Sequence, residues 1–180
     1  ENVYMIKASN TRKTNGYIEN LIKERWAEIS KNPKAKDNPR ARFEGSFYDK
    51  NSHMFHIYWS NERYMNHAAL REPKLPRHYQ ANLFTINGIP LTKDMKIPIV
   101  IRNPKATDQG RIRHIAPAGF VDVINGGTRA ETPHEATERE LKEELRYKDL
   151  ETFPPEVFNP NDMRVLGIVY NSLRNFDYTA

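Results

Sequence analysis

Residues 132–135, Thr-Pro-His-Glu, define where a helix begins and constrain the fold more than any other stretch of the chain. The Thr132 hydroxyl suits the N-cap, proline suits the first helical position, and Glu135 is placed to bond back to the cap amide. Leu141 and Leu145 lie one turn apart further along and give the helix an apolar stripe for packing. The sequence therefore predicts an amphipathic helix that begins near Thr132.

The same helix carries an acidic face. Glu140, Glu143 and Glu144 fall within an arc of about 100°, and Glu131 precedes Arg139 by eight positions. Such a cluster of carboxylates is costly without a cation, and oxygen ligands favour Mg²⁺, with Mn²⁺ as a substitute. A metal bound in this way suits phosphoanhydride cleavage, because it stabilises charge on a phosphoryl oxygen and activates a bound water.

A second interpretation of the acidic face needs no metal. The pattern Arg-Glu-Leu-x-Glu-Glu also occurs on exposed helices that ordinary ion pairs support. Two neighbouring features favour the metal site. Glu131 stands just before the capping box, and residues 117–119, Pro-Ala-Gly, follow a predicted strand, where a tight turn can bring backbone carbonyl groups to the same place.

Composition limits the remaining possibilities. The 180 residues suffice for one domain, or one domain with an extension, and 38% hydrophobic residues can form a core. Twelve prolines and a mean hydropathy of -0.81 predict many loops. The chain has no cysteine, which excludes disulfides, thiolate zinc sites and cysteine nucleophiles, and fits an intracellular, cytoplasmic protein.

Charge and hydropathy say less about partners. A net charge of +5 favours polyanions such as nucleotides, nucleic acids or anionic membranes, but Lys and Arg are spread along the chain as on an ordinary solvated surface. No apolar run approaches the roughly 18 residues that a membrane span needs. The start lacks a signal-peptide pattern, although a chain that begins without Met leaves a removed targeting segment open.

The N-terminal half predicts a small α+β unit. Residues 3–6 are a strand or a tethered terminus, and residues 17–29 show helical periodicity that buries Trp26. Residues 34–42 are a predicted loop. Aromatic residues then supply two short strands around a turn at 49–52, which favours a half-buried hairpin over a base-stacking platform. A short helix over 61–71 ends at a proline-containing break, 72–76, where a domain boundary is expected.

The C-terminal half predicts strands on both sides of the acidic helix. They cover residues 81–91, 96–102, 111–115 and 164–170, with a turn at 92–95, a polar loop at 103–110 and a proline-bearing connection at 153–161. Strands before and after a helix indicate an α/β fold with a mixed sheet and helices packed on it.

Glu131, seven intervening residues, and Arg139-Glu140-Leu141-Lys142-Glu143-Glu144 resemble the second half of the Nudix box, and residues 117–122 resemble its opening. That box reads glycine, five residues, glutamate, seven residues, then Arg-Glu-aliphatic-x-Glu-Glu-x-Gly-aliphatic. Eleven residues, not five, separate Gly119 from Glu131, which we interpret as an insertion, 123–130, with a turn at 125–127. A register that starts from Gly126 or Gly127 makes the spacing too short.

A further departure is Arg146, which stands where the box has a glycine. It indicates that the helix continues or ends without the usual left-handed cap, and it touches no predicted ligand.

The resemblance implies a Nudix-type α/β/α sandwich over residues 79–180, incomplete at the C-terminus, with an N-terminal α+β extension over residues 1–78. The implied activity is Mg²⁺-dependent hydrolysis of a nucleoside diphosphate linked to another group. Its metal ligands would be Glu140, Glu144 and the Ala118 carbonyl. Glu143 would be a further ligand or the catalytic base, and Arg139 would pair with Glu131 to brace the helix.

The substrate is less constrained. Trp26, Asn32-Pro33, Phe43, Tyr64 and residues 165–171 are similar to Nudix hydrolases that act on UDP-sugars and carry such an extension. A tryptophan-centred core accounts for the same residues equally well. We expect a nucleotide sugar such as UDP-glucose or ADP-ribose, with four residues as candidate substrate contacts: Arg102, Arg113, Asn171 and Arg174.

Two other functions stay open. An mRNA-decapping Nudix enzyme would suit the basic charge and the aromatic residues, and a non-catalytic Nudix module would sense a nucleotide without cleaving it. The chain has all the implied metal-binding glutamates, which argues against the non-catalytic module. The expected partner is a small nucleotide, with nucleic acid only in the decapping case and no membrane. A homodimer is left open.

Overall fold

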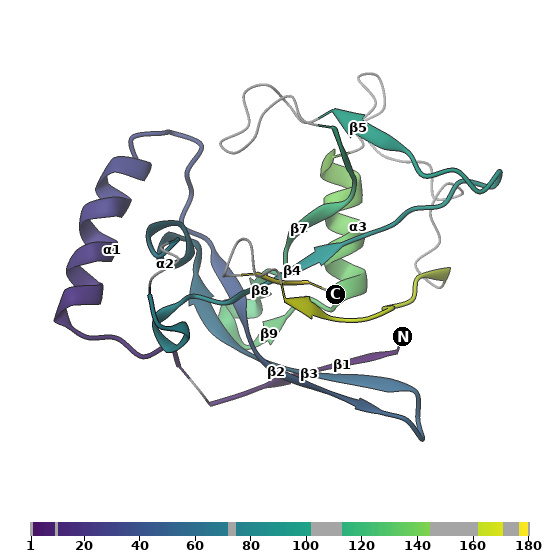
Figure 1. Cartoon of the computed structure of the whole chain (residues 1–180), viewed down its shortest axis with the longest axis horizontal. Helices are drawn as coiled ribbons and strands as arrows, with labels where there is room; N and C mark the ends of the chain where they lie inside the picture. The colour runs from purple at the N-terminus through teal and green to yellow at the C-terminus, as the bar shows by residue number, and fades with distance from the viewer. Residues whose placement is uncertain are drawn as a thin grey trace.

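The computed structural model describes residues 2–9, 11–71, 75–101, 113–144, 162–170 and 177–179. These form a mixed α/β fold with a main sheet in the strand order β1-β3-β2-β4-β11-β10, while β7 pairs with β4 (Figure 1). The main-sheet strands are β1 (Val3–Lys7), β2 (Pro39–Asp49), β3 (Met54–Arg63), β4 (Leu83–Asn87), β7 (Ala118–Phe120), β10 (Val169–Tyr170) and β11 (Asp177–Thr179). The predicted α/β class is therefore confirmed.

Two small ladders and three α-helices complete the described part of the chain. The ladders pair β5 (Ile99–Ile101) with β6 (Arg113–Ile115), and β8 (Val123–Ile124) with β9 (Arg129–Ala130). The helices are α1 (Gly16–Ile29), α2 (Tyr64–Ala69) and α3 (Pro133–Glu144), and two short 3-10 turns are η1 (Arg77–Tyr79) and η2 (Asn125–Gly127). In Figure 1, α1 and α2 lie together at one end, and α3 lies beside β7. Within the described residues, no helix has the length and apolar character needed to cross a membrane.

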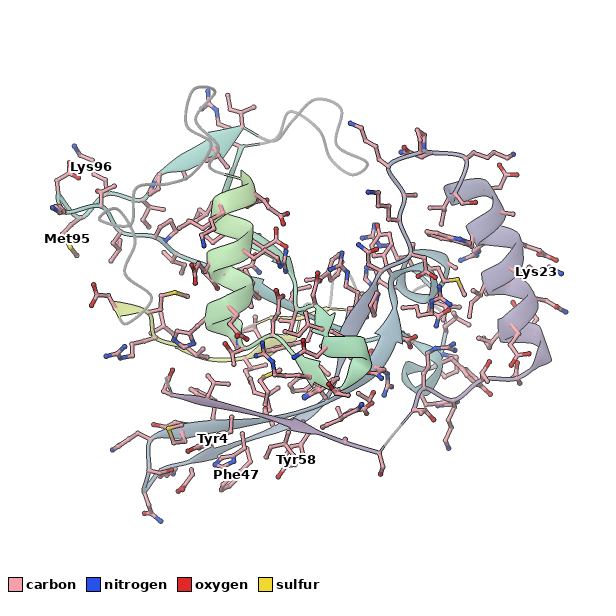
Figure 2. The ribbon with its side chains drawn as sticks, turned by 180° about the vertical axis from the view of Figure 1, so that it is seen from behind. Tyr4, Lys23, Phe47, Tyr58, Met95 and Lys96 are labelled. Carbon is pink, nitrogen blue, oxygen red and sulfur yellow. The ribbon has the colours of Figure 1, made fainter. Side chains whose placement is uncertain are left out.

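The aromatic hairpin of β2 and β3 is confirmed and is longer than predicted. Its turn is held by the Asp49 carboxylate, which accepts bonds from the Asn51 amide at 2.9 Å and the Ser52 hydroxyl at 2.6 Å. Phe43 and Trp59 face inward and are buried. On the opposite face Tyr4, Phe47 and Tyr58 point away from the core (Figure 2). This alternation is what a half-buried sheet requires.

Several predicted boundaries were wrong. Residues 39–42, assigned to a loop, belong to β2 because they pair with the end of β3. Residues 61–63 belong to β3, so α2 is shorter than predicted. The predicted strand at 81–91 ends at Asn87, and the one at 96–102 contracts to β5, which pairs with β6. Only residues 169–170 of the strand predicted over 164–170 pair in the sheet, although Val165 and Ile168 pack against the core.

The first helix is confirmed, but not its predicted core residue. Asn15 caps α1 by accepting a hydrogen bond from the Ile18 amide at 3.0 Å. Ile18 and Ile22 are the buried side chains of this helix. Trp26 is only half-buried and meets Tyr64 edge-on, with ring centroids 6.4 Å apart. Burial of the two isoleucines against α2 leaves Trp26 at the rim of that contact.

One hydrophobic core spans the position of the predicted domain boundary. It joins residues on both sides of residue 78: Val3, Ala41, Phe43, Ile57, Trp59, Phe84, Ile86, Val121, Val123, Ala130 and Ala136. The main sheet crosses the same position, since Arg42 of β2 pairs with Leu83 of β4. The division into residues 1–78 and 79–180 stays a prediction.

Candidate functional site

The acidic helix begins where the capping box predicts. The Glu135 amide donates to the Thr132 hydroxyl at 3.2 Å, and the Thr132 amide donates to the Glu135 carboxylate at 2.8 Å. Arg129 adds a salt bridge to Glu135 at 2.7 Å. These reciprocal bonds satisfy helix-end amides that would otherwise lack partners, and so fix the position of α3 relative to the preceding strand.

The segment predicted to be an insertion is a small hairpin. β8 and β9 pair through Val123 and Ala130, and the turn between them uses positive φ angles at Asn125, Gly126 and Gly127. The hairpin returns the chain to its starting point, because the Glu131 amide donates to the Asp122 carbonyl at 2.9 Å. The extra residues therefore leave Glu131 beside the strand that carries Gly119.

Arg139 is the centre of the charge network. Its guanidinium donates to Glu131 at 2.9 and 3.0 Å, to Glu140 at 2.6 Å and to the Phe120 carbonyl at 2.7 Å. Glu131 is buried, and its second oxygen also accepts from the Asp122 amide at 3.0 Å. The predicted pair of Arg139 and Glu131 is thus present. It ties α3 to residues 120–122.

The Glu140 carboxylate lies against the backbone of β7, in the space that a side chain at position 119 would occupy. An ideal Cβ built on Gly119 would lie 1.9 Å from Glu140 Oε1 and 2.0 Å from Glu140 Cδ. Real Cβ atoms do not approach other atoms so closely. By contrast, the space around an added Cβ on Gly126 is open. Gly119, the glycine that the predicted register uses, is therefore the one in contact with the acidic face.

The last turn of α3 presents the two remaining carboxylates. Glu144 accepts a hydrogen bond from the Ala118 amide at 3.1 Å. Glu143 lies 3.8 Å from Arg139, and its side chain is 58% exposed, which leaves it open to water and to a ligand. The structure thus brings together the side chains of Glu131, Arg139, Glu140, Glu143 and Glu144. Ala118 joins them through its amide, and its carbonyl stays a predicted ligand.

An ion pair that the sequence does not predict lies at the edge of this cluster. Arg40 of β2 pairs with Asp122, and its guanidinium lies 5.5 Å from the centre of the Phe120 ring. Burial, with the nearby Arg139 cation, lowers the pKa of Arg40. No signal around Arg40 marks this contact, because it depends on how β2 and residues 121–122 pair in space.

Burial and neighbouring charges have opposing effects on the pKa values of the two central groups, Glu140 and Arg139. Burial raises the pKa of Glu140, and the neighbouring carboxylates Glu143 and Glu144 add to this, whereas Arg139 opposes it. Burial alone would lower the pKa of Arg139, but its bonds to Glu131 and Glu140 outweigh that cost and raise it. Ionisation of Glu140 is therefore costly in the absence of another cation.

The oxygen atoms of the carboxylates in this cluster are the type of ligand that a hard cation prefers. In the arrangement described, however, no three Asp, Glu, His or Cys side chains among the described residues lie together as a metal site. Glu140 is held by Arg139, and Glu144 by the Ala118 amide. A cation would bind these carboxylates alongside their protein donors.

Of the four predicted substrate contacts, the described residues include Arg113 alone. Arg113 is exposed on β6, and no contact in the described ranges joins it to the acidic residues. Arg102, Asn171 and Arg174 lie outside the described residues. Neither a family model nor a curated protein matches the chain.

Proposed function

We propose that this chain is a Nudix-type pyrophosphohydrolase that uses Mg²⁺, with Mn²⁺ as a substitute. It cleaves the diphosphate linkage of a nucleoside diphosphate joined to another moiety, a nucleotide sugar such as UDP-glucose or ADP-ribose. The fold proposed with this activity is the α/β/α sandwich of that family. An intracellular location and a homodimer remain predictions.

One observation carries the proposal, namely the contact between Glu140 and Gly119. A carboxylate that is only 14% exposed lies against a glycine backbone, with Arg139 braced by buried Glu131 behind it. An exposed helix stabilised by ordinary ion pairs needs neither the glycine nor the buried brace. Both are expected where the carboxylate must be held at a fixed place beside the β7 backbone.

The charge balance supports a cation at this position. Among the described residues of the cluster, five carboxylates (Asp122, Glu131, Glu140, Glu143 and Glu144) face two guanidinium groups, those of Arg40 and Arg139. The surplus of negative charge is partly buried, so water screens it poorly. A divalent cation would offset that surplus.

Each residue then has a role in the proposed reaction. Glu140, Glu144 and the Ala118 carbonyl hold the metal, while Arg139 and Glu131 keep Glu140 in position. Glu143 is the most exposed of the three predicted ligand carboxylates on α3, which suits a further ligand or a base that takes a proton from water. The bound metal would polarise the phosphoryl oxygen and lower the pKa of the attacking water.

The experiment is a hydrolysis assay with a panel of nucleotides. Purified protein is incubated with UDP-glucose, ADP-ribose, NADH, coenzyme A, dinucleoside polyphosphates and capped RNA, each with Mg²⁺, Mn²⁺ or EDTA. We expect metal-dependent turnover of a nucleotide sugar, with a nucleoside monophosphate as one product. Preference for capped RNA would replace the proposed substrate class, and binding without any turnover would indicate a sensor.

Substitutions on α3 identify the carboxylates that hydrolysis requires. We predict that Glu144→Gln lowers kcat at least about a hundredfold with the fold intact, as expected for loss of a principal electrostatic element. Glu138→Gln is the matched control, because Glu138 lies on the same helix, pairs with Lys142 at 2.6 Å and is not one of the proposed metal ligands. Equal rates for the two variants would mean that the carboxylates are wrongly assigned.

A further inference from the structure

β2 brings Arg40 to the acidic site from a distant part of the chain. The Arg40 backbone forms an antiparallel bridge with Asp122, and the Ala41 amide donates to the Val121 carbonyl at 2.9 Å. β2 therefore runs directly beside residues 121–122, which connect Gly119 with the hairpin. A strand of the N-terminal region thus borders the segment on which the acidic cluster is built.

The Arg40 side chain is held from two sides. It pairs with the Asp122 carboxylate and covers the Phe120 ring, and the two side chains of the pair are 16% and 26% exposed. A guanidinium suits this place better than an ammonium, because its planar group stacks on a ring while it bonds a carboxylate.

The backbone just before Arg40 is anchored as well. The Tyr64 amide donates to the Asn38 carbonyl at 3.0 Å, and the Met65 amide donates to the Asp37 carboxylate at 2.9 Å. These bonds tie the start of β2 to the start of α2. Arg40 therefore extends from a fixed backbone.

Asp122 connects Arg40 to the catalytic carboxylates. Its backbone exchanges two hydrogen bonds with Glu131, and its carboxylate lies 3.7 Å from Arg139. Arg139 in turn holds Glu140 at 2.6 Å. If Asp122 lost its own cation, Arg139 would be the nearest replacement, and a move toward Asp122 would draw Arg139 away from Glu140.

We infer that Arg40 is a positioning residue of the acidic site and acts through Asp122. By occupying the Asp122 carboxylate, it leaves Arg139 free to brace Glu140 at the β7 backbone. The inference rests on the proposed function for its link to catalysis. The contacts themselves do not depend on any reaction.

Removal of the Arg40 side chain can either tighten or weaken Mn²⁺ binding. The direction of that change separates a positioning role from a purely electrostatic one. Removing a cation from an acidic cluster should tighten Mn²⁺ binding if only the charge counts. Displacement of Glu140 should weaken Mn²⁺ binding instead. A purely structural Arg40 would change only the free energy of unfolding.

The experiment compares Arg40→Met, Asp122→Asn and the double variant with wild type. Arg63→Met is the matched control, because Arg63 also pairs with an aspartate, Asp37, but is 60% exposed and makes no contact with the acidic cluster in the described structure. The readouts are Mn²⁺ affinity by electron paramagnetic resonance, the Arg139 Nε–H signal in NMR spectra, and urea unfolding.

We expect Arg40→Met to weaken Mn²⁺ binding at least about threefold and to shift the Arg139 signal, because small displacements of a positioned group are costly. Asp122→Asn removes the charge that would attract Arg139, so it should leave both signals close to wild type, and the double variant should restore them relative to Arg40→Met. If Arg40→Met does not fold, the smaller change Arg40→Gln carries the test. Arg63→Met should leave both signals unchanged.

Tighter or unchanged Mn²⁺ binding together with an unshifted Arg139 signal would overturn the inference, whatever the loss of stability. A double variant that stays as impaired as Arg40→Met would also overturn it. Failure of the proposed function looks different. In that case wild type neither binds Mn²⁺ nor hydrolyses any nucleotide, and the Arg139 signal alone still reports whether Arg40 positions that side chain.

Discussion

At the scale of single residues, the candidate site depends on the absence of a side chain at Gly119. The Glu140 carboxylate occupies the volume that a Cβ would need. Arg139 and Glu131 then fix the direction from which Glu140 approaches. A carboxylate held by backbone contact on one side and a braced guanidinium on the other has little freedom to move.

The substitution Gly119→Ala tests this contact. Because its Cβ would collide with the Glu140 carboxylate, which is the end of a flexible side chain, we predict that this carboxylate is displaced, with a small loss of unfolding free energy and a large loss of hydrolysis. Gly45→Ala is the control, since no atom lies within 4 Å of its added Cβ. Urea unfolding and turnover measure the two effects, and equal behaviour of both variants would contradict the close contact.

The raised pKa of Glu140 predicts how stability depends on pH without metal. In the pH range between the ordinary carboxyl pKa and the raised one, the folded state holds a proton that the unfolded state has lost. The contribution of Glu140 to the free energy of unfolding is therefore complete at low pH. It is lost as the pH rises through that range. Glu140→Gln lacks the effect.

Urea unfolding in EDTA at pH 4 and pH 7 measures this pH dependence of stability. The stability of Glu140→Gln relative to wild type should be greater at pH 7 than at pH 4. Glu138→Gln should show no comparable change. An opposite trend would mean that Arg139 outweighs the burial of Glu140.

At the scale of elements, α3 is the best-predicted part of the protein because its signals are local. The cap, the proline and Glu135 act within one turn, so the start of α3 follows from neighbouring residues alone. The extent of β2 and the contact of Arg40 with Asp122 instead depend on partners far along the chain. The prediction of a strand over 164–170 was wrong because pairing also depends on distant partners. Apolar residues there pack on the core without pairing in the sheet.

The capping box should contribute measurably to stability. We predict that Thr132→Ala lowers the unfolding free energy by about 1 kcal/mol, since it removes the cap acceptor for the Glu135 amide. Thr137→Ala is the control, because Thr137 bonds only the preceding turn of the same helix, at the Pro133 carbonyl. Its replacement by a better helix former should be neutral or stabilising. The reverse order of the two variants in urea unfolding would contradict the assigned cap.

At the scale of the whole molecule, the N-terminal region shares a core and a sheet with the residues that carry the site. The core contains Trp59 and Phe43 together with Phe84 and Val121, and the sheet crosses from β2 to β4. We predict that a fragment of residues 79–180 does not fold by itself, since it would expose that core face. Circular dichroism and thermal unfolding test this prediction. A cooperative transition in the fragment would show that the predicted boundary separates two independent domains.

The central claim is that the carboxylates of α3, held against β7, support metal-dependent hydrolysis. The most direct test is the hydrolysis rate of the preferred nucleotide as Mg²⁺ is added back to protein stripped with EDTA. For wild type we predict a rate that rises from background to saturation, and for Glu144→Gln a maximal rate at least about a hundredfold lower. Turnover that survives EDTA, or that is the same in Glu144→Gln as in wild type, would contradict the account.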